Sequence, residues 1–204
     1  MKKFNKKKLT FIGLILFLFL LIAGIVIFDK NMVIDEAIYN FIFNFRTPLL
    51  DKYFTFITHF GDTIFIIIFV AIFMLICRSE DSVFLSLSAV NSALMTLIFK
   101  HIFVRSRPGH IRLVEQGGYS FPSGHSMISV CVYGYLFYLA RKIKNNVLRY
   151  IIRILLILLI LSVGISRIYV GVHHPTDVIG GYLLGLIGVI FIMEVFNLYK
   201  TRGN

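Results

Sequence analysis

Long apolar runs alternate with short polar segments along the chain, which has 204 residues. Six of the runs are long enough, at roughly 20 residues each, to cross a bilayer as helices. The predicted spans lie at about 9–28, 54–77, 82–103, 123–140, 148–170 and 176–199. Because these runs use most of the chain and backbone polar groups in lipid must be bonded within their own helix, the pattern predicts an all-α membrane bundle of six transmembrane helices. Residues 1–204 are expected to form a single membrane-embedded domain.

A shorter periodic pattern lies between the first two spans. Apolar residues recur there at helical spacing, with Asp35 and Glu36 in the first turn: Val33, Ile34, Ala37, Ile38, Phe41, Ile42 and Phe45. This pattern predicts a short amphipathic helix over 33–45 that lies in the membrane interface. We expect it mainly to anchor the two neighbouring spans, and a wall or lid for a lipid substrate is the alternative.

Composition and charge agree with a multi-pass protein of the cell membrane. The chain is 58% hydrophobic with a net charge of +11. If both termini are cytoplasmic, 13 of the 21 Lys and Arg residues lie on the cytoplasmic side, as the positive-inside rule requires. The charge therefore indicates contact with membrane lipids and not with nucleic acid. The first span, which follows five lysines, is expected to be an uncleaved anchor.

Three polar clusters stand out because they occur at the ends of apolar spans. They read Lys100-x6-Arg107-Pro108, Pro122-Ser123-Gly124-His125 and Ser166-Arg167-x5-His173-x3-Asp177. With a cytoplasmic N-terminus, the span ends that carry them all fall on the outer face. A charge at the bilayer centre costs roughly 2.5–3.5 kcal/mol on insertion scales. We therefore expect the clusters to meet in one outward-facing cavity.

The residue types in these clusters suit a phosphoryl group. Lys100, Arg107 and Arg167 are cations without a matching set of acids nearby, and guanidinium groups bind phosphate oxygens in pairs. Ser123 and Gly124 would place a helix N-terminus, with its unpaired amides, at the same point. For each cation alone, contact with lipid phosphates by snorkelling is an equal alternative.

His173 and Asp177 are four residues apart around Pro175, which suits the first turn of a helix. At that spacing the carboxylate can orient the imidazole for nucleophilic attack, or it can serve only as a favourable charge at a helix start. The adjacent His174 lacks a partner at the same spacing. Zinc or a two-metal centre is not expected, because such sites need several convergent donors and the cations would repel a divalent ion. No cofactor is predicted.

The three clusters resemble the signature of the type 2 phosphatidic acid phosphatase family, also called lipid phosphate phosphatases, whose pattern is K-x6-R-P, P-S-G-H and S-R-x5-H-x3-D. The chain matches all eleven specified residues with the family's spacing inside each motif. The resemblance implies a metal-independent phosphatase in which His173 attacks phosphorus, Asp177 orients it, and His125 protonates the leaving oxygen and then activates water. The residues that would hold the phosphoryl oxygens are Lys100, Arg107, Ser123, Gly124 and Arg167.

The resemblance also implies a substrate class. Small bacterial members of the family act on phosphatidylglycerol phosphate, undecaprenyl pyrophosphate and other lipid phosphates. Head-group choice is expected to depend on Glu115, Gln116, Tyr119 and the 33–45 helix. Transfer of the phosphoryl group to another acceptor is an alternative, and so is a lipid-phosphate transporter or non-catalytic binder. Vanadium-dependent peroxidase chemistry is less favoured, since those relatives are soluble. The pattern does not indicate an oligomeric state.

Overall fold

The computed structural model describes residues 6–28 and 33–202, and within these ranges the chain consists of helices and loops. Lys2 and Lys3, which are counted on the predicted cytoplasmic side, and Lys30, which is counted on the outer side, lie outside the described residues. The α-helices are α1 (Lys6–Phe28), α2 (Val33–Phe43), α3 (Pro48–Thr58), α4 (Thr63–Cys77), α5 (Glu80–Phe103), α6 (Gly124–Leu139), α7 (Asn146–Tyr169) and α8 (Pro175–Arg202). Two short 3-10 helices, η1 (His59–Gly61) and η2 (Ala140–Lys142), follow α3 and α6.

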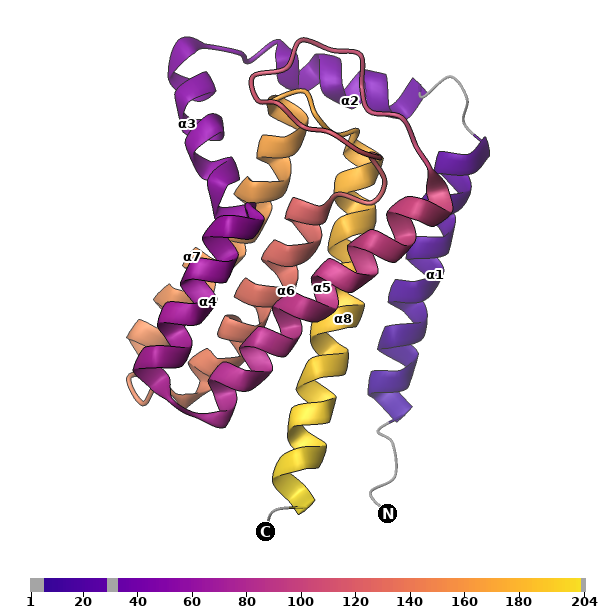
Figure 1. The fold of residues 1–204 in the computed structure, drawn as a ribbon. Helices are drawn as coiled ribbons and strands as arrows, with labels where there is room; N and C mark the ends of the chain where they lie inside the picture. Colours follow the sequence, from indigo (N-terminus) through magenta and orange to yellow (C-terminus); the bar gives the residue numbers. More distant parts are fainter. Residues whose placement is uncertain (1–5, 29–32, 203–204) are drawn as a thin grey trace.

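The centre of the bundle is α6, which packs against α5, α7 and α8 (Figure 1). Its side chains from Ser126 to Tyr133 are buried, and they meet apolar residues of α4, α5 and α8 in the main core. The first helix, α1, packs on the outside against α8. The loop between α5 and α6, together with α2, covers the end of the bundle that lies opposite the start of α1 and the end of α8 (Figure 1).

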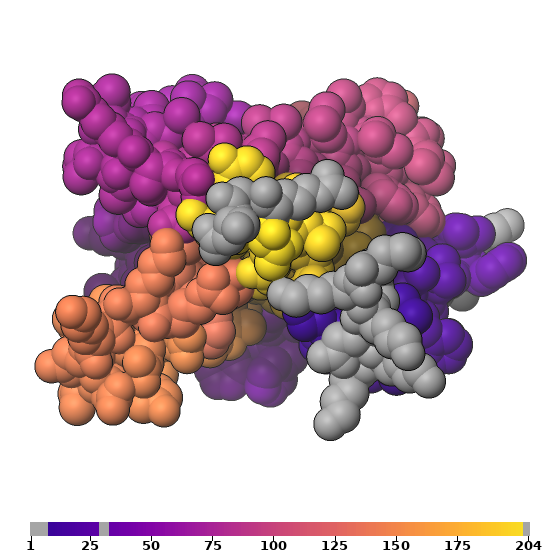
Figure 2. Space-filling model, turned by 90° about the horizontal axis from the view of Figure 1, so that it is seen from below, coloured from indigo at the N-terminus to yellow at the C-terminus, as the bar shows by residue number. Residues whose placement is uncertain are grey.

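The end of the bundle at which the chain starts and finishes is seen in Figure 2. There α8 occupies the middle, with α1, α7 and the α4–α5 connection around it. Cations at this end pair with acids near the helix ends: Lys8 with Glu194, Lys142 with Asp81 and Lys200 with Glu80. These contacts fit the predicted cytoplasmic side, whose orientation in the membrane stays a prediction.

Local sequence signals set where several helices begin. Thr47, Ser123 and Asn145 are N-caps of α3, α6 and α7, and each side-chain oxygen accepts a hydrogen bond from the amide three residues later. Proline occupies the first position of both α3 and α8, where the missing amide proton costs no hydrogen bond.

Fewer helices meet the length and hydropathy expected of a membrane span than the six that the sequence predicts. Four described helices, α1, α5, α7 and α8, are long and apolar enough to cross a membrane, and a fifth span results if α3 and α4 count as one. α6 has 16 residues, a length of about 24 Å at 1.5 Å per residue, which is less than the roughly 30 Å of hydrocarbon in a bilayer. The all-helical architecture is confirmed, and the count of six stays a prediction.

The helix predicted over 54–77 is wrong as one continuous span. The chain bends by 56° between Pro48–Gly61 and Thr63–Cys77. Asp62 at the break has extended backbone angles, φ −69° and ψ 138°. The Tyr133 hydroxyl of α6 donates to the Phe60 carbonyl (2.6 Å), so a carbonyl near the break is satisfied by a neighbouring helix. An apolar run with a good helical period carries no signal for this tertiary compensation.

The amphipathic helix predicted over 33–45 is present as α2, with its bounds at Val33 and Phe43. It lies across the loop-covered end of the bundle (Figure 1). Its buried side chains are Asp35 and Tyr39, whereas Val33 and Phe41 are 64% exposed. The helix therefore turns an acidic residue inward and apolar residues outward, which is the arrangement of a helix that faces lipid.

Candidate active site

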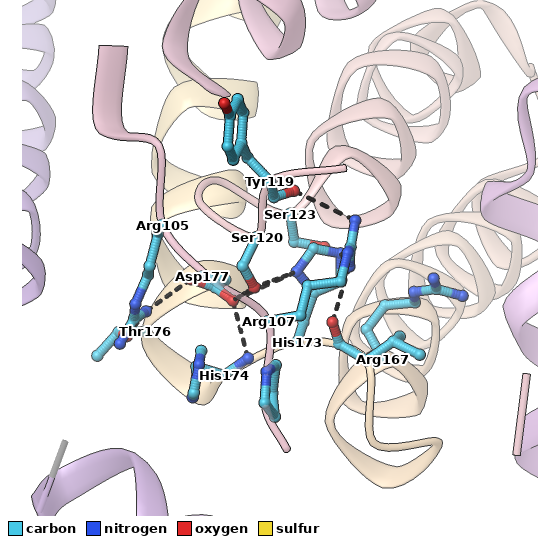
Figure 3. A network of polar contacts seen from close by, with 12 residues as sticks. Arg105, Arg107, Tyr119, Ser120, Ser123, Arg167, His173, His174, Thr176 and Asp177 are labelled. Carbon is cyan, nitrogen blue, oxygen red and sulfur yellow. Dashed lines mark hydrogen bonds and ion pairs between the residues drawn. The ribbon is translucent and has the colours of Figure 1, made fainter. Parts of the chain in front are cut away.

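The three sequence clusters meet at the loop-covered end of the bundle. Lys100 lies in the last turn of α5, Arg107 in the loop after it, and Arg167 in the last turn of α7. The Ser123-Gly124-His125 segment opens α6, His173 lies in the loop before α8, and Asp177 lies in the first turn of α8. Figure 3 shows Arg107, His173 and Asp177 close together, with Arg167 beside them and the Tyr119 and Ser120 segment of the loop above them.

A cavity of about 300 Å³ lies at this meeting point. Five residues of the predicted set line it: Lys100, Arg107, Gly124, His125 and His173. Ser123, Arg167 and Asp177 are buried next to these residues, with at most 1% of each residue exposed. The predicted residues therefore surround one hollow, some as its lining and some as supports.

His173 is held at both ring nitrogens. Its Nδ1 lies 3.3 Å from Asp177 Oδ2, and its Nε2 lies 3.1 Å from Arg107 Nη1. Asp177 on Nδ1 fixes the tautomer, so that the Nε2 lone pair faces the Arg107 guanidinium at the cavity. Burial lowers the pKa of His173 to about 3, and the charges of Arg167 and Arg107 act in the same direction. The imidazole is therefore neutral at physiological pH, the form that can act as a nucleophile.

Asp177 is completely buried and fully bonded. One carboxylate oxygen accepts hydrogen bonds from the Ser120 hydroxyl and from the His174 backbone amide (2.8 Å). The other oxygen accepts from Arg105 Nη1 (2.6 Å). These bonds fix the direction in which Asp177 presents an oxygen to His173.

Arg105 links this carboxylate to a second buried acid. Its Nη2 donates to Asp35 Oδ2 of α2 (2.6 Å), and its Nη1 also donates to the Thr176 hydroxyl (2.7 Å). Asp35 in turn accepts from the Thr176 amide (2.8 Å), which is one of the unpaired amides at the start of α8. The amphipathic helix α2 is thus bonded to the helix start that carries Asp177.

Lys100 and Arg107 lie close enough to share an acceptor. The Tyr119 carbonyl accepts from Lys100 Nζ and from Arg107 Nη2 (3.2 Å). Arg107 also donates to the carbonyls of Gly117, Gly118 and Val172, so its guanidinium is held against the loop. Burial lowers the pKa of Arg107 to about 10, which keeps the group charged at neutral pH. Two cations held this closely favour a polyanionic ligand between them.

Arg167 is the most buried cation of the cluster, with 1% of the residue exposed. Its Nη1 donates to the Thr58 hydroxyl (2.6 Å) and its Nη2 to Gln116 Oε1 (2.7 Å). Its Nε has no hydrogen-bond partner among the described residues. A buried, charged donor without an acceptor is costly, and an oxyanion bound in the cavity would satisfy it.

At the start of α6, Ser123 accepts hydrogen bonds from the amide and the hydroxyl of Ser126 (3.4 and 3.0 Å). Its oxygen thus caps the helix, and its hydroxyl proton remains to be donated. His125 follows, with its Nε2 2.8 Å from Asp62 Oδ1 at the α3–α4 break. Both histidines of the site therefore have a carboxylate partner.

The turn that presents His173 requires a glycine. Gly171 has φ +77°, and a Cβ there would lie 2.4 Å from the Ile111 carbonyl oxygen of the long loop. The amides of Val172 and His173 both donate to the Arg167 carbonyl (3.2 Å each). These hydrogen bonds hold the short connection between α7 and α8 against the end of α7, so that His173 lies close to Arg167.

Sequence reasoning missed the polar residues that support the site. They are Asp35, Asp62, Arg105, Ser120 and Thr176. Asp35 and Asp62 lie far from the clusters in sequence, and Arg105 falls at an unspecified position inside the first one, so no spacing signal marked them. His174 was set aside as lacking a partner, and the structure uses its backbone amide, not its ring, on Asp177.

Comparisons with known proteins agree with this geometry. The family model described as the PAP2 superfamily matches residues 81–200. "Phosphatidylglycerophosphatase B" of Bacillus subtilis is 35% identical over 195 residues, which cover 91% of this chain and 94% of that protein. The crystal structure of a transmembrane PAP2-type phosphatidylglycerolphosphate phosphatase from Bacillus subtilis superposes with a TM-score of 0.81 at 30% identity, covering 91% of this chain and 96% of the other. Aquifex aeolicus LpxE gives a TM-score of 0.66 at 27% identity, covering 78% and 93%.

Proposed function

The chain belongs to the PAP2 superfamily and is a multi-pass membrane lipid phosphatase, and from this premise we propose that it hydrolyses a lipid phosphate or pyrophosphate, without a metal, through a phosphohistidine formed on His173. The observation that carries the proposal is the position of the His173 ring. A neutral imidazole lies between the Asp177 carboxylate and the Arg107 guanidinium and lines a cavity that Lys100 also lines.

The reaction divides into two transfers at phosphorus. In the first, His173 Nε2 forms the P–N bond while the bond from phosphorus to the lipid oxygen breaks, and His125 gives that oxygen a proton. In the second, water attacks phosphorus, the P–N bond breaks, and His125 takes the proton from water. Asp177 stabilises the positive charge that His173 acquires while it carries the phosphoryl group.

The cations supply the electrostatic part of catalysis. Charge on the equatorial oxygens grows in the transition state of phosphoryl transfer. Lys100, Arg107 and the free Nε of Arg167 are donors already fixed at the cavity, with Ser123 and the amide end of α6 beside them. Donors that are positioned before the reaction need no reorganisation as the charge develops. Such a concentration of positive charge also disfavours a divalent metal ion.

The shape of the cavity supports a lipid substrate. Its polar end gives way to Ala93, Leu97 and Ile128 on α5 and α6. A second hollow of about 330 Å³ shares Thr63, Ala93 and Ile128 with the first and continues along apolar residues of α4 and α5. A phosphate at the cations could therefore extend an acyl or isoprenyl chain along this apolar surface. We propose phosphatidylglycerol phosphate and undecaprenyl pyrophosphate as candidate substrates, and the outer membrane face as the side on which the site opens.

The test is phosphate release by the purified protein in bilayers that contain one candidate lipid at a time, with EDTA present throughout. We expect release from at least one of these lipids, inhibition by vanadate, and no turnover by His173→Ala. Wild-type turnover by that variant, or a complete requirement for a divalent ion, would contradict the proposal. A phosphorylated acceptor in place of free phosphate would indicate a transferase, and binding without release would indicate a transporter or binder.

A further inference from the structure

The break between α3 and α4 brings a carboxylate to the proton-transfer histidine. Asp62 Oδ1 lies 2.8 Å from His125 Nε2, and Asp62 Oδ2 lies 2.6 Å from His59 Nδ1. The His125 side chain is 14% exposed, whereas those of Asp62 and His59 are 39% and 59% exposed. The carboxylate thus bridges a histidine that lines the cavity and a histidine at the surface.

Asp62 occupies a position where aspartate ordinarily has another use. It is the N-cap residue of α4, and an aspartate there usually accepts hydrogen bonds from the first-turn amides. Those amides are all among the described residues, and none of them donates to the Asp62 side chain. Both carboxylate oxygens bond to imidazoles instead. The Asp62 side chain therefore does not cap its own helix, and it bonds instead to His125, which is 63 positions away in the sequence.

The backbone beside Asp62 is fitted closely to the His125 ring. A Cβ on Gly61 would lie 2.9 Å from His125 Cδ2 and 2.9 Å from Val163 Cγ1. Such distances are shorter than ordinary carbon contacts, so only glycine fits there without a shift. Gly61 and Asp62 therefore contact one edge of the imidazole together, at Cδ2 and Nε2.

We propose that Asp62 is a positioning residue for His125, which fixes the ring so that Nδ1 faces the reacting phosphoryl group and Nε2 keeps its proton. This inference rests on the proposed phosphatase function. A carboxylate on one ring nitrogen selects the tautomer, raises the basicity of the other nitrogen and stabilises the imidazolium form. The site then contains two histidine–carboxylate pairs, His173 with Asp177 for attack and His125 with Asp62 for proton transfer.

The proton balance follows from this arrangement. The first transfer requires His125 in its imidazolium form, with one proton on Nδ1 and one on Nε2 toward Asp62. The Nδ1 proton passes to the lipid oxygen as the P–O bond breaks, and the Nε2 proton stays in place. When water attacks the phosphohistidine, its proton returns to Nδ1. Asp62 remains a carboxylate throughout and never contacts the substrate.

The experiment compares two leaving groups in Asp62→Asn. A phosphatidic acid with short acyl chains leaves as an alkoxide that needs a proton, whereas 4-nitrophenyl phosphate leaves as a stable phenolate that does not. We expect kcat for phosphatidic acid to fall by about 10–100-fold, part of the roughly 10²–10⁴-fold that general acid–base catalysis contributes. The first-turnover burst of nitrophenolate should stay within about threefold of wild type, because formation of the phosphoenzyme from that ester needs no acid.

Two further variants separate positioning from folding. Asp51→Asn removes the same charge from the same segment at a side chain that bonds Arg46 and Tyr169, outside the cavity, and it should leave both rates unchanged. In a His125→Gln background, Asp62→Asn should cause no additional loss, because a residue that acts through His125 has no effect without it.

Equal losses for both leaving groups, full activity of Asp62→Asn on phosphatidic acid, or additive losses in the double variant would each overturn this role of Asp62. Any of these results would leave the phosphatase assignment intact so long as the wild-type protein turns over. Failure of the wild-type protein to release phosphate from these two esters and from both candidate lipids would instead overturn the proposed function itself.

Discussion

The buried trio of Asp35, Arg105 and Asp177 makes a quantitative prediction about stability. Arg105 lies between two carboxylates, at 2.6 Å from each, and the exposed fractions of the three side chains are 8% or less. Arg105→Met leaves two buried acids facing each other without the guanidinium. Asp35→Asn leaves a neutral Arg105–Asp177 pair, and the amide oxygen can still accept from Thr176.

The two variants should therefore differ in cost. Breaking a buried ion pair by removing one partner costs about 3–5 kcal/mol. We expect Arg105→Met to lower the free energy of unfolding by that full amount. Asp35→Asn should lower it by about 1–3 kcal/mol, the range for weakened buried hydrogen bonds. At about 2–4 °C per kcal/mol for a chain of this size, the unfolding midpoint should fall by about 6–20 °C for Arg105→Met and by about 2–12 °C for Asp35→Asn.

The assay is thermal unfolding of both variants and the wild-type protein in the same detergent, followed by the loss of helical circular dichroism. Asp51→Asn, at a partly exposed acid, should shift the midpoint by no more than a few degrees and serves as the control. A midpoint for Arg105→Met equal to or above that of Asp35→Asn would refute the reasoning, because it would mean that the guanidinium does not hold the two carboxylates together.

Other predictions concern the site more directly. Arg167→Ala should lower kcat for a lipid phosphate by about 10²–10³-fold, the cost of one lost transition-state donor, and a loss below about threefold would contradict its role. Gly171→Ala should lower the unfolding midpoint more than Gly118→Ala, because both residues have positive φ but only at Gly171 does a Cβ meet the backbone, at 2.4 Å from Ile111 oxygen. His173, with its pKa lowered by burial to about 3, should remain neutral at pH 5 in NMR spectra of labelled histidine; an imidazolium signal there would contradict this. Because the unfolded chain protonates His173 near pH 6.5 and the folded protein only near pH 3, this residue should reduce stability as the pH falls through that window.

Convergence of the candidate site residues could be predicted because each cluster lies at a helix end. Once the spans are placed with a cytoplasmic N-terminus, Lys100, His125, Arg167 and Asp177 must fall at the same side of the bundle, whatever the packing of the helices. The structure places them around one cavity. Their chemical roles stay predictions that the experiments above address.

The supporting residues could not be predicted, because their partners are set by tertiary packing. Asp62 follows Gly61 in a short stretch, 58–63, that also contains His59, and nothing in this stretch indicates that the carboxylate meets a histidine of α6. Asp35 looks like an ordinary first-turn acid of an amphipathic helix, yet it turns inward to Arg105. Helical period and hydropathy report which face is apolar, and they carry no information about which distant charge a lone acid will meet.

The central claim is that His173 carries the phosphoryl group, and the most direct measurement is to identify the residue that becomes labelled. The protein is mixed with a lipid phosphate that carries a radioactive phosphoryl group, quenched in alkali during the first turnover, and digested for peptide mapping. The account predicts an alkali-stable, acid-labile phosphate on the peptide that contains His173, and no label in His173→Ala. A label on any other residue, or rapid phosphate release by His173→Ala, would contradict it.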